Sequence, residues 1–142
     1  MIYLDAAYIA KFYVEEDDSE RVRTFLDSTP IAASCIHGMA EVACVFHRKL
    51  REGNIPQEDF DFFSAQFESD CEAGLWTWLP MSESLVQSVR RKMSTLAPAT
   101  FIRAADALHL MCAAAEGCTT IHTSDRHMKA AAPAFGLDAV IL

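Results

Sequence analysis

The chain has 142 residues, of which 51% are hydrophobic and 23% are charged, and its formal net charge is −8 at pH 7. This composition excludes a disordered chain, and the length predicts one globular domain that covers residues 1–142. Proteins that hold nucleic acid through their overall field are basic. This chain is therefore expected to reach nucleic acid only through a local basic patch, a metal site or a partner.

The start of the chain and its cysteines indicate a cytoplasmic protein. The apolar segment Ile2–Leu4 follows Met1 directly, which predicts no secretory leader, and charged residues interrupt the longest apolar region, so no membrane span is expected. The five cysteines are odd in number and form no CxxC pair, which argues against a disulfide framework and a zinc ribbon. Cys44 and Cys112 stand at helical spacing among apolar residues and are expected in the core.

Short apolar segments alternate with helical patterns along the chain. The predicted strands are Ile2–Leu4, Pro30–Ser34, Leu75–Leu79, Thr119–Thr123 and Ala139–Leu142. The predicted helices are Ala6–Val14, Ser19–Ser28, His37–Arg51, Pro56–Glu72, Ser82–Leu96, Phe101–Glu116 and Arg126–Ala134. This alternation predicts an α/β fold in which a central parallel sheet of four to five strands lies between helices on both faces. The first and last strands have almost no polar residues, which predicts burial on both faces.

Four acidic residues are predicted to converge at one edge of this sheet. Asp5 directly follows the first strand and Asp125 follows the fourth, so both belong at the carboxyl edge, where ligands bind in such folds. Glu41 lies one to two turns into a helix that starts at the same edge. Asp106 lies on the apolar face of the helix that leads to the fourth strand. An acid on an apolar face is costly unless it is paired, hydrogen-bonded or bound to a metal.

Each acid also has a purely structural interpretation. Asp5 could cap the helix that follows it, and either Ser124 or Asp125 could cap the last helix. Glu41 could pair with Arg48 two turns along, and Asp106 with the arginine three residues before it, although such helix pairs contribute only a few tenths of a kcal/mol. Capping does not exclude metal binding, because a carboxylate has two oxygens.

The convergence of these acids favours a bound cation. Four carboxylates repel one another strongly unless a positive charge lies among them. Hard oxygen ligands select Mg²⁺ or Mn²⁺ over zinc or copper. Such an ion can lower the pKa of a bound water, orient it and offset charge on a phosphoryl oxygen. Asp106 is therefore expected to be a metal ligand or the close neighbour of one.

Four segments of the chain resemble, in order, the motifs of PIN-domain ribonucleases, and most closely those of VapC-type toxins of type II toxin–antitoxin pairs. The segments are IYLDAAYIAKFYVEE, SCIHGMAEVACVFHRKL, RAADALHLMCAAAEG and IHTSDRHMKAAAPAFGLDAVIL. The resemblance covers essentially the whole chain. It implies a single PIN domain with an α/β/α sandwich and metal-dependent endonucleolytic cleavage of RNA, for which transfer RNA and ribosomal RNA are the precedented substrates.

The resemblance also implies roles for individual residues. Asp5, Glu41, Asp106 and Asp125 match the acidic quartet of the family and are the expected catalytic residues. Asp5, Asp106 and Asp125 would hold Mg²⁺ or Mn²⁺. Glu41 would bind the metal directly or through a water molecule, or help to activate the attacking water. Thr123 matches a polar residue that commonly supports this site.

Two further features bear on activity. Arg48 shares the helix face of Glu41, and we expect it to support the site by meeting a phosphate. The family usually has Ser or Thr directly after the first aspartate, whereas this chain has Ala6 and Ala7. Loss of a supporting hydroxyl can reduce metal affinity or activity roughly 10–100-fold. A catalytically weak or inactive module that binds RNA or an antitoxin therefore stays open as an alternative.

Two other interpretations are disfavoured by the sequence. A phosphoacceptor receiver domain needs a pair of acids after the first strand and a lysine after the last, and this chain has one acid and no such lysine. A zinc site made of His109, His122 and His127 would have irregular spacing and no ligating cysteine pair. Structural hydrogen bonds are the expected role of His109 and His122.

Two protein partners are expected. The resemblance implies a cognate antitoxin encoded by an adjacent gene, whose tail would present an arginine to the acidic site. A two-fold homodimer is expected because an isolated chain of net charge −8 offers RNA little attraction, and pairing would let basic residues of both chains line one groove. The segment Gln57–Glu72 alternates aromatic and acidic residues, which favours a lid, a dimer surface or an antitoxin groove over an RNA contact.

Overall fold

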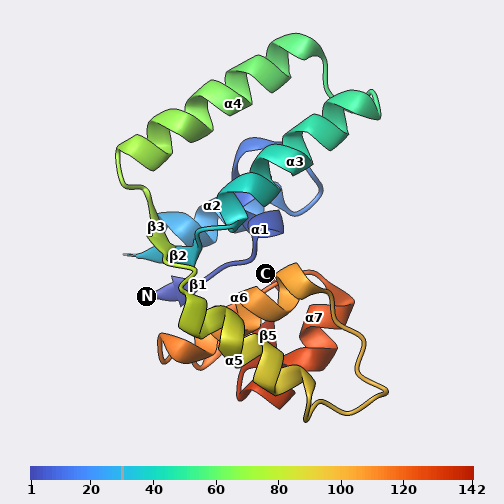
Figure 1. Cartoon of the computed structure of the whole chain (residues 1–142). Helices are drawn as coiled ribbons and strands as arrows, with labels where there is room; N and C mark the ends of the chain where they lie inside the picture. Colours follow the sequence, from blue (N-terminus) through green and yellow to red (C-terminus); the bar gives the residue numbers. More distant parts are fainter. Residues whose placement is uncertain (30) are drawn as a thin grey trace.

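The computed structural model describes residues 1–29 and 31–142 and places its strands side by side in parallel (Figure 1). The strands are β1 (Ile2–Tyr3), β2 (Ala32–Cys35), β3 (Trp76–Leu79), β4 (Thr120–His122) and β5 (Asp138–Val140). β1 pairs with β2, β2 with β3, and β4 with β5. The expected parallel sheet is thereby confirmed.

The two parts of the sheet meet between β1 and β4. Leu4 forms a parallel bridge with His122, and the backbone N–H of Asp5 donates to the carbonyl of His122 at 3.1 Å. The spatial order of the strands is therefore β3-β2-β1-β4-β5. The chain moves outward from β1 in both directions, so the order reverses at β1 and β4.

Helices cover both faces of this sheet. They are α1 (Ala6–Tyr13), α2 (Ser19–Asp27), α3 (Gly38–Arg51), α4 (Gln57–Glu72), α5 (Glu83–Met93), α6 (Ala104–Ala115) and α7 (Arg126–Ala131), which continues into the short 3-10 helix η1 (Ala132–Phe135). In Figure 1, α1 to α4 lie on one side of the strands and α5 to α7 on the other. This arrangement confirms the α/β/α sandwich.

The alternation of side chains along the strands divides the core in two. Successive side chains of a strand point to opposite faces of the sheet. Tyr3 and Ala33 accordingly join the core under α5, α6 and α7, whereas Leu4 and Ala32 join the core under α1, α3 and α4. Each helical layer is thus held by its own apolar cluster, and the two layers meet at the strand ends.

Two expectations drawn from hydrophobicity are wrong. β5 was expected to be buried on both faces, but it is the edge strand beyond β4, and Asp138 and Val140 are exposed. Cys44 was expected in the core, but it is exposed on α3, whereas Cys112 is buried as expected. An apolar run shows neither the position of a strand in the sheet nor which face of a helix meets the core. Pro30, the expected start of the second strand, lies outside the described residues.

Two further observations concern the cysteines and the helices of the described residues. All five cysteines are free thiols. None of the described helices combines the length and the apolar character that crossing a bilayer requires.

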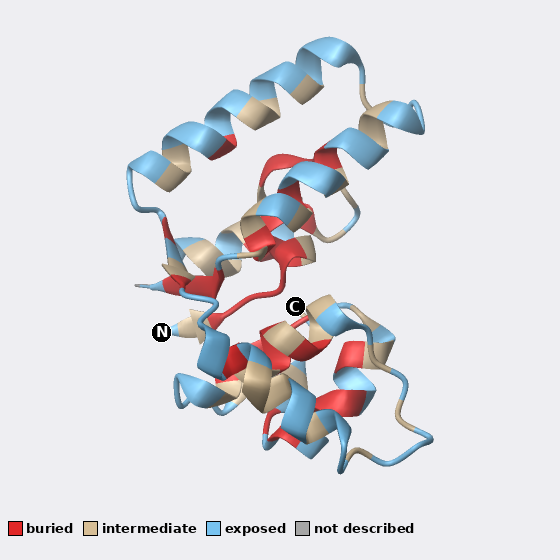
Figure 2. Cartoon of the chain, in the orientation of Figure 1, coloured by how far each residue is buried: buried red, intermediate tan, exposed pale blue. Residues whose placement is uncertain are grey.

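The aromatic residues of α4 mostly serve packing. Figure 2 shows α4 exposed along most of its length, with buried or half-buried residues on one side. Phe63 and Phe67 contact Phe46 of α3, whereas Phe62 is 64% exposed. The alternation of aromatic and acidic residues therefore describes a helix that lies on α3 and leaves one aromatic side chain on the surface.

Tyr13 connects α1 to both α4 and β3 through its hydroxyl group. The Tyr13 hydroxyl donates to Asp70 Oδ2 at 2.8 Å and accepts the indole N–H of Trp76 at 2.7 Å. Tyr13→Phe keeps the ring but leaves the buried indole N–H without its acceptor. The free energy of unfolding is expected to fall by about 1–3 kcal/mol, measured by urea denaturation.

Tyr8→Phe is the matched control for this variant. Tyr8 is also buried, but the partner of its hydroxyl among the described residues is the backbone N–H of Leu142, a half-buried residue that water can reach. A smaller loss is expected in the control. Equal losses in the two variants would contradict the role given to the Trp76 bond.

Candidate active site

Asp5 lies between β1 and α1, where the strand ends and the helix begins. Its side chain is buried. Oδ1 accepts the backbone N–H of Tyr8 at 3.0 Å and caps α1, and Oδ2 accepts the hydroxyl of Thr123 at 2.5 Å. Burial raises the pKa of Asp5, against the opposing effect of these two hydrogen bonds. The carboxylate is thus held rigidly in surroundings that disfavour its charge.

Thr123 joins the ends of β1 and β4. Besides donating to Asp5, its buried hydroxyl accepts the backbone N–H of Asp125 at 3.0 Å. Asp125 in turn caps α7, because its Oδ1 accepts the N–H groups of His127 and Met128 at 2.6 and 2.9 Å. The capping interpretation is correct for both aspartates, and in Asp125 it uses only one of the two carboxylate oxygens.

Glu41 and Asp106 approach from the two helical layers. Glu41 lies in the first turn of α3 and Asp106 in the first turn of α6, and both are half-buried. Burial, followed by the negative charge of Asp125, raises the pKa of Asp106, and the charge of Glu41 adds to this effect. The acids therefore lie close enough to repel one another.

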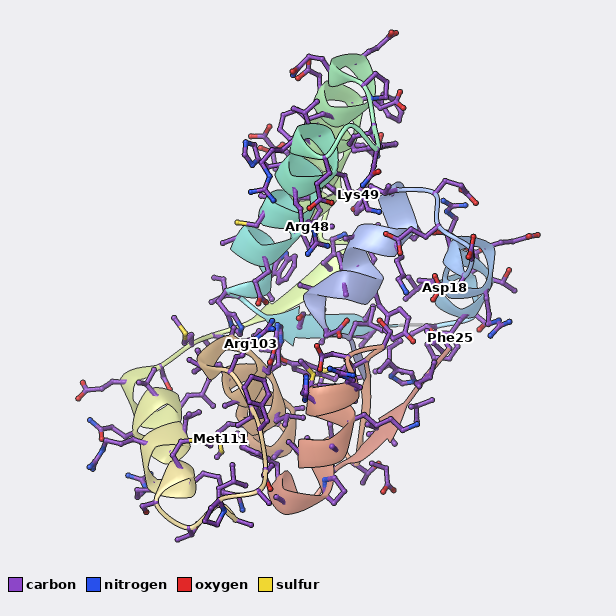
Figure 3. All side chains as sticks on the ribbon, turned by 90° about the vertical axis from the view of Figure 1, so that its right-hand side faces the viewer. Asp18, Phe25, Arg48, Lys49, Arg103 and Met111 are labelled. Carbon is purple, nitrogen blue, oxygen red and sulfur yellow. The ribbon has the colours of Figure 1, made fainter. Side chains whose placement is uncertain are left out.

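One cavity of about 220 Å³ brings these acids together. The acids that line it are Asp5, Glu41, Asp106 and Asp125. Arg48 and Arg103 also line it, and Figure 3 shows Arg48 on α3 and Arg103 directly before α6. The cavity lies beyond the carboxyl ends of β1 and β4, where the strand order reverses and where open α/β sheets bind ligands.

The sequence of this chain matches the PIN-domain family over residues 2–133. The chain belongs to the PIN-domain family. This result confirms the family expected from the sequence motifs and excludes the receiver domain.

The fold of this PIN domain is similar to three solved structures. VapC20 of Mycobacterium tuberculosis, described as a sarcin–ricin loop cleaving toxin, has a TM-score of 0.71 and 13% identity over 92% of this chain and 95% of that chain. FitAcB of Neisseria gonorrhoeae has a TM-score of 0.70 and 20% identity over 98% and 96%. FitAB bound to the IR36 DNA fragment has a TM-score of 0.69 and 19% identity over 99% and 94%. No curated protein sequence is significantly similar to the chain.

The donor set of the PIN-domain cavity fits a hard divalent cation. All four acids offer oxygen ligands, which suit Mg²⁺ and Mn²⁺. Burial is the main cause of the raised pKa values of Asp5 and Asp106, and the charges of neighbouring acids add to it. Among the described residues, no three of the four acids bring ligand atoms within 4.8 Å of one another. A cation among them would relieve the repulsion, and their oxygen donors are of the kind that the expected metal prefers.

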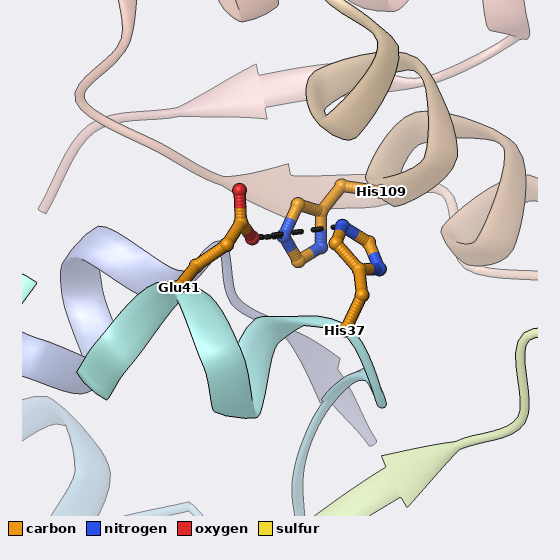
Figure 4. Close-up of side chains that lie close together, drawn as sticks. All are labelled: His37, Glu41 and His109. Carbon is orange, nitrogen blue, oxygen red and sulfur yellow. Dashed lines mark hydrogen bonds and ion pairs between the residues drawn. The ribbon is translucent and has the colours of Figure 1, made fainter. Parts of the chain in front are cut away.

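The structure adds two residues that the sequence analysis missed. His37 lies beside Glu41 and His109 (Figure 4), and Tyr3 contacts His109 from behind this pair. His109 is buried and joins them: its Nδ1 lies 2.9 Å from the Tyr3 hydroxyl and its Nε2 lies 2.7 Å from Glu41 Oε2. Glu41 is therefore held by His109 and not by Arg48. The i,i+4 spacing of His37 and Glu41 is visible in the sequence, but nothing marks Tyr3 apart from other strand residues.

Hydrogen bonding around Glu41 favours its ionised form. Burial opposes ionisation, but the hydrogen bond from His109 and the charges of His109 and His37 outweigh it and lower the pKa of Glu41. His122 has the structural role that was expected for it, because its Nδ1 donates a hydrogen bond to the carbonyl of Tyr3 at 3.2 Å.

Proposed function

We propose that this PIN domain is a Mg²⁺- or Mn²⁺-dependent endoribonuclease that acts in the cytoplasm as the toxin of a toxin–antitoxin pair. The observation that carries this proposal is the convergence of four carboxylates, from four separate parts of the chain, on one cavity at the reversal point of a PIN fold. The structural similarity to VapC20, described as a sarcin–ricin loop cleaving toxin, supports RNA as the substrate.

In this mechanism the acids divide into ligands and a proton acceptor. Asp5, Asp106 and Asp125 would hold the ion, which when bound lowers the pKa of a water and offsets charge on a phosphoryl oxygen. Glu41 would contact the ion directly or through a water. Because the pKa of Glu41 is lowered, its carboxylate is ionised at neutral pH and able to take a proton from the attacking water.

Arg48 and Arg103 supply the local positive charge that the chain as a whole lacks. Both guanidinium groups are exposed and line the acidic cavity. Arginine binds phosphate oxygens through paired hydrogen bonds and stays charged. We therefore assign these two residues to the phosphates on either side of the scissile bond of transfer RNA or ribosomal RNA.

A non-catalytic module remains the second candidate because of Ala6 and Ala7. Both line the cavity, where the family usually offers hydroxyl groups. In this chain the hydroxyl that binds Asp5 comes from Thr123 instead.

The decisive experiment incubates the purified protein with transfer RNA and with ribosomal RNA fragments, with Mn²⁺ and with a chelator. Cleavage only in the presence of metal supports the ribonuclease. Binding of RNA without cleavage at any metal concentration supports the non-catalytic module, and neither binding nor cleavage would contradict both.

We also infer a two-fold homodimer. The net charge of −8 leaves one chain with little attraction for RNA, and a second copy would bring another Arg48 and Arg103 to the same groove. Sedimentation velocity at micromolar concentration is expected to give the mass of a dimer. A single boundary at the monomer mass would contradict this inference.

The same cavity is suited to a basic inhibitor. Carboxylates with raised pKa values, left without metal, favour a guanidinium group, which binds carboxylates through two hydrogen bonds. We propose that the antitoxin from the adjacent gene presents such an arginine on a basic tail. The segment Gln57–Glu72, on which Phe62 is exposed, is the surface proposed for the rest of this tail.

A further inference from the structure

Two histidines beside Glu41 form a cluster that the proposed mechanism does not use. His37 precedes α3, Glu41 lies one turn further along, and His109 reaches them from α6. One ligand atom from each of the three side chains lies within 4.8 Å of the other two (Figure 4). The cluster therefore joins the two helical layers at the edge of the acidic cavity.

His109 is oriented as metal-binding histidines are. Its Nδ1 is engaged by the Tyr3 hydroxyl, which in turn accepts the backbone N–H of Cys35 at 2.9 Å. Burial strongly raises the pKa of Tyr3, so the phenol stays neutral. Metal-binding histidines almost always use one ring nitrogen for such a partner and the other for the ion. Here the nitrogen left for an ion is Nε2, which points at Glu41.

His37 is the member whose polar atoms are least satisfied. Both of its ring nitrogens are buried and form no hydrogen bond of normal geometry with a described residue, although Cys35 and the backbone of Ala105 lie close enough to interact with the ring. Its Nε2 lies 3.5 Å from Glu41 Oε2, and its ring is tilted against that of His109 with the centroids 4.2 Å apart. Buried polar atoms without partners are costly. A bound ion at Nε2 would remove part of this cost.

We propose that His37, Glu41 and His109 form a binding site for Zn²⁺, which lies beside the Mg²⁺ or Mn²⁺ site of the four acids and shares Glu41 with it. Two imidazole nitrogens and one carboxylate oxygen are a ligand set that zinc accepts, with a fourth position left for water. Zinc bonds of about 2.0–2.1 Å at tetrahedral angles place neighbouring ligand atoms about 3.3 Å apart. The 3.5 Å separation of His37 and Glu41 already fits, and the 2.7 Å contact of His109 and Glu41 opens slightly.

Zinc at this site regulates the enzyme, because both sites need Glu41. An ion held by the two histidines fixes Glu41 Oε2 and neutralises its charge, so Glu41 no longer serves the acidic cavity. Zn²⁺ is therefore an inhibitor of the Mn²⁺-dependent reaction. This consequence rests on the proposed ribonuclease function, but the binding of zinc does not.

The test measures Zn²⁺ binding by calorimetry in the wild type, in His37→Gln and in Asp106→Asn. The wild type is expected to bind one ion per chain. His37→Gln is expected to lose more affinity than the roughly 10–100-fold that loss of an outer partner costs. Asp106→Asn, which alters only the acidic site, is expected to keep wild-type zinc affinity. Circular dichroism and thermal melting check that both variants are folded.

Equal zinc affinity in the wild type and folded His37→Gln would overturn the site. So would an equal loss in Asp106→Asn, which would place the ion among the acids. In the cleavage assay, Zn²⁺ is expected to inhibit the wild type strongly and to inhibit His37→Gln much less, with each rate compared with the zinc-free rate of the same protein. If no RNA is cleaved, the ribonuclease proposal fails, and the calorimetric comparison still decides the zinc site.

Discussion

Asp106→Asn is expected to reduce Mn²⁺-dependent RNA cleavage by at least about 100-fold, the loss that follows removal of one strong electrostatic stabiliser from an active site. The substitution keeps the size of the side chain and one oxygen, but removes the charge. Initial cleavage rates in the wild type and the variant, at saturating Mn²⁺, measure the effect. Cleavage undiminished in the variant would contradict the assignment of Asp106 as a metal ligand.

The same variant is expected to change stability in opposite directions with and without metal. Without metal, burial and the charge of Asp125 already disfavour the ionised form of Asp106, so its neutral replacement leaves the melting temperature equal or higher. With millimolar Mn²⁺, the wild type gains stability because the ion binds only the folded state, and Asp106→Asn gains less. A lower melting temperature in both conditions would indicate a folding defect in place of a lost metal ligand.

Asp138→Asn is the matched control for the charge change. Asp138 is exposed on the edge strand β5 and does not line the acidic cavity. The control also reduces the net negative charge by one. Cleavage and the response to Mn²⁺ are expected to stay at wild-type levels, so a loss common to both variants would point to overall charge.

The fold was predictable to the extent that it depends on periodicity. The alternation of apolar segments and helical patterns predicts the parallel sheet, because parallel strands need helical crossovers between them. Positions within the sheet were not predictable. The sequence of β5 predicts a fully buried strand. In the structure β4 lies between β1 and β5, so β5 is at the edge of the sheet and is partly exposed.

The acids of the candidate site were predictable because they stand at fixed places in the chain. Asp5 lies two residues beyond β1 and Asp125 three residues beyond β4, and the ends of these parallel strands meet at one sheet edge. The partners of these acids depend on contacts between distant segments. Tyr3 and His109 are separated by 106 positions, and His109 and Glu41 by 68. No local spacing reports such contacts, so the cluster that holds Glu41 appears only in the folded chain.

Thr123→Val is expected to lower the free energy of unfolding by about 2–3 kcal/mol, measured by denaturation in the presence of a chelator. The side chain keeps its shape but loses the hydroxyl that donates to Asp5 and accepts the N–H of Asp125. The Asp5 carboxylate and the backbone N–H of Asp125 then lose the hydroxyl to which they were hydrogen-bonded. Thr123→Ser restores the hydroxyl and is expected to keep most of the stability, so equal losses in the two variants would contradict this account.

The loss in Thr123→Val is also expected to depend on pH in a defined direction. The Thr123 hydrogen bond lowers the pKa of Asp5, which burial raises, so its removal raises the folded-state pKa further. At a pH above the pKa of Asp5 in the variant, the variant is less stable than the wild type by the full amount. As the pH falls from that value through the lower pKa of Asp5 in the wild type, this difference in stability shrinks. Metal affinity is expected to fall roughly 10–100-fold in the same variant at neutral pH, because Asp5 loses the group that orients it. A stability difference that stays constant as the pH falls would show that Thr123 acts through packing and not through the Asp5 carboxylate.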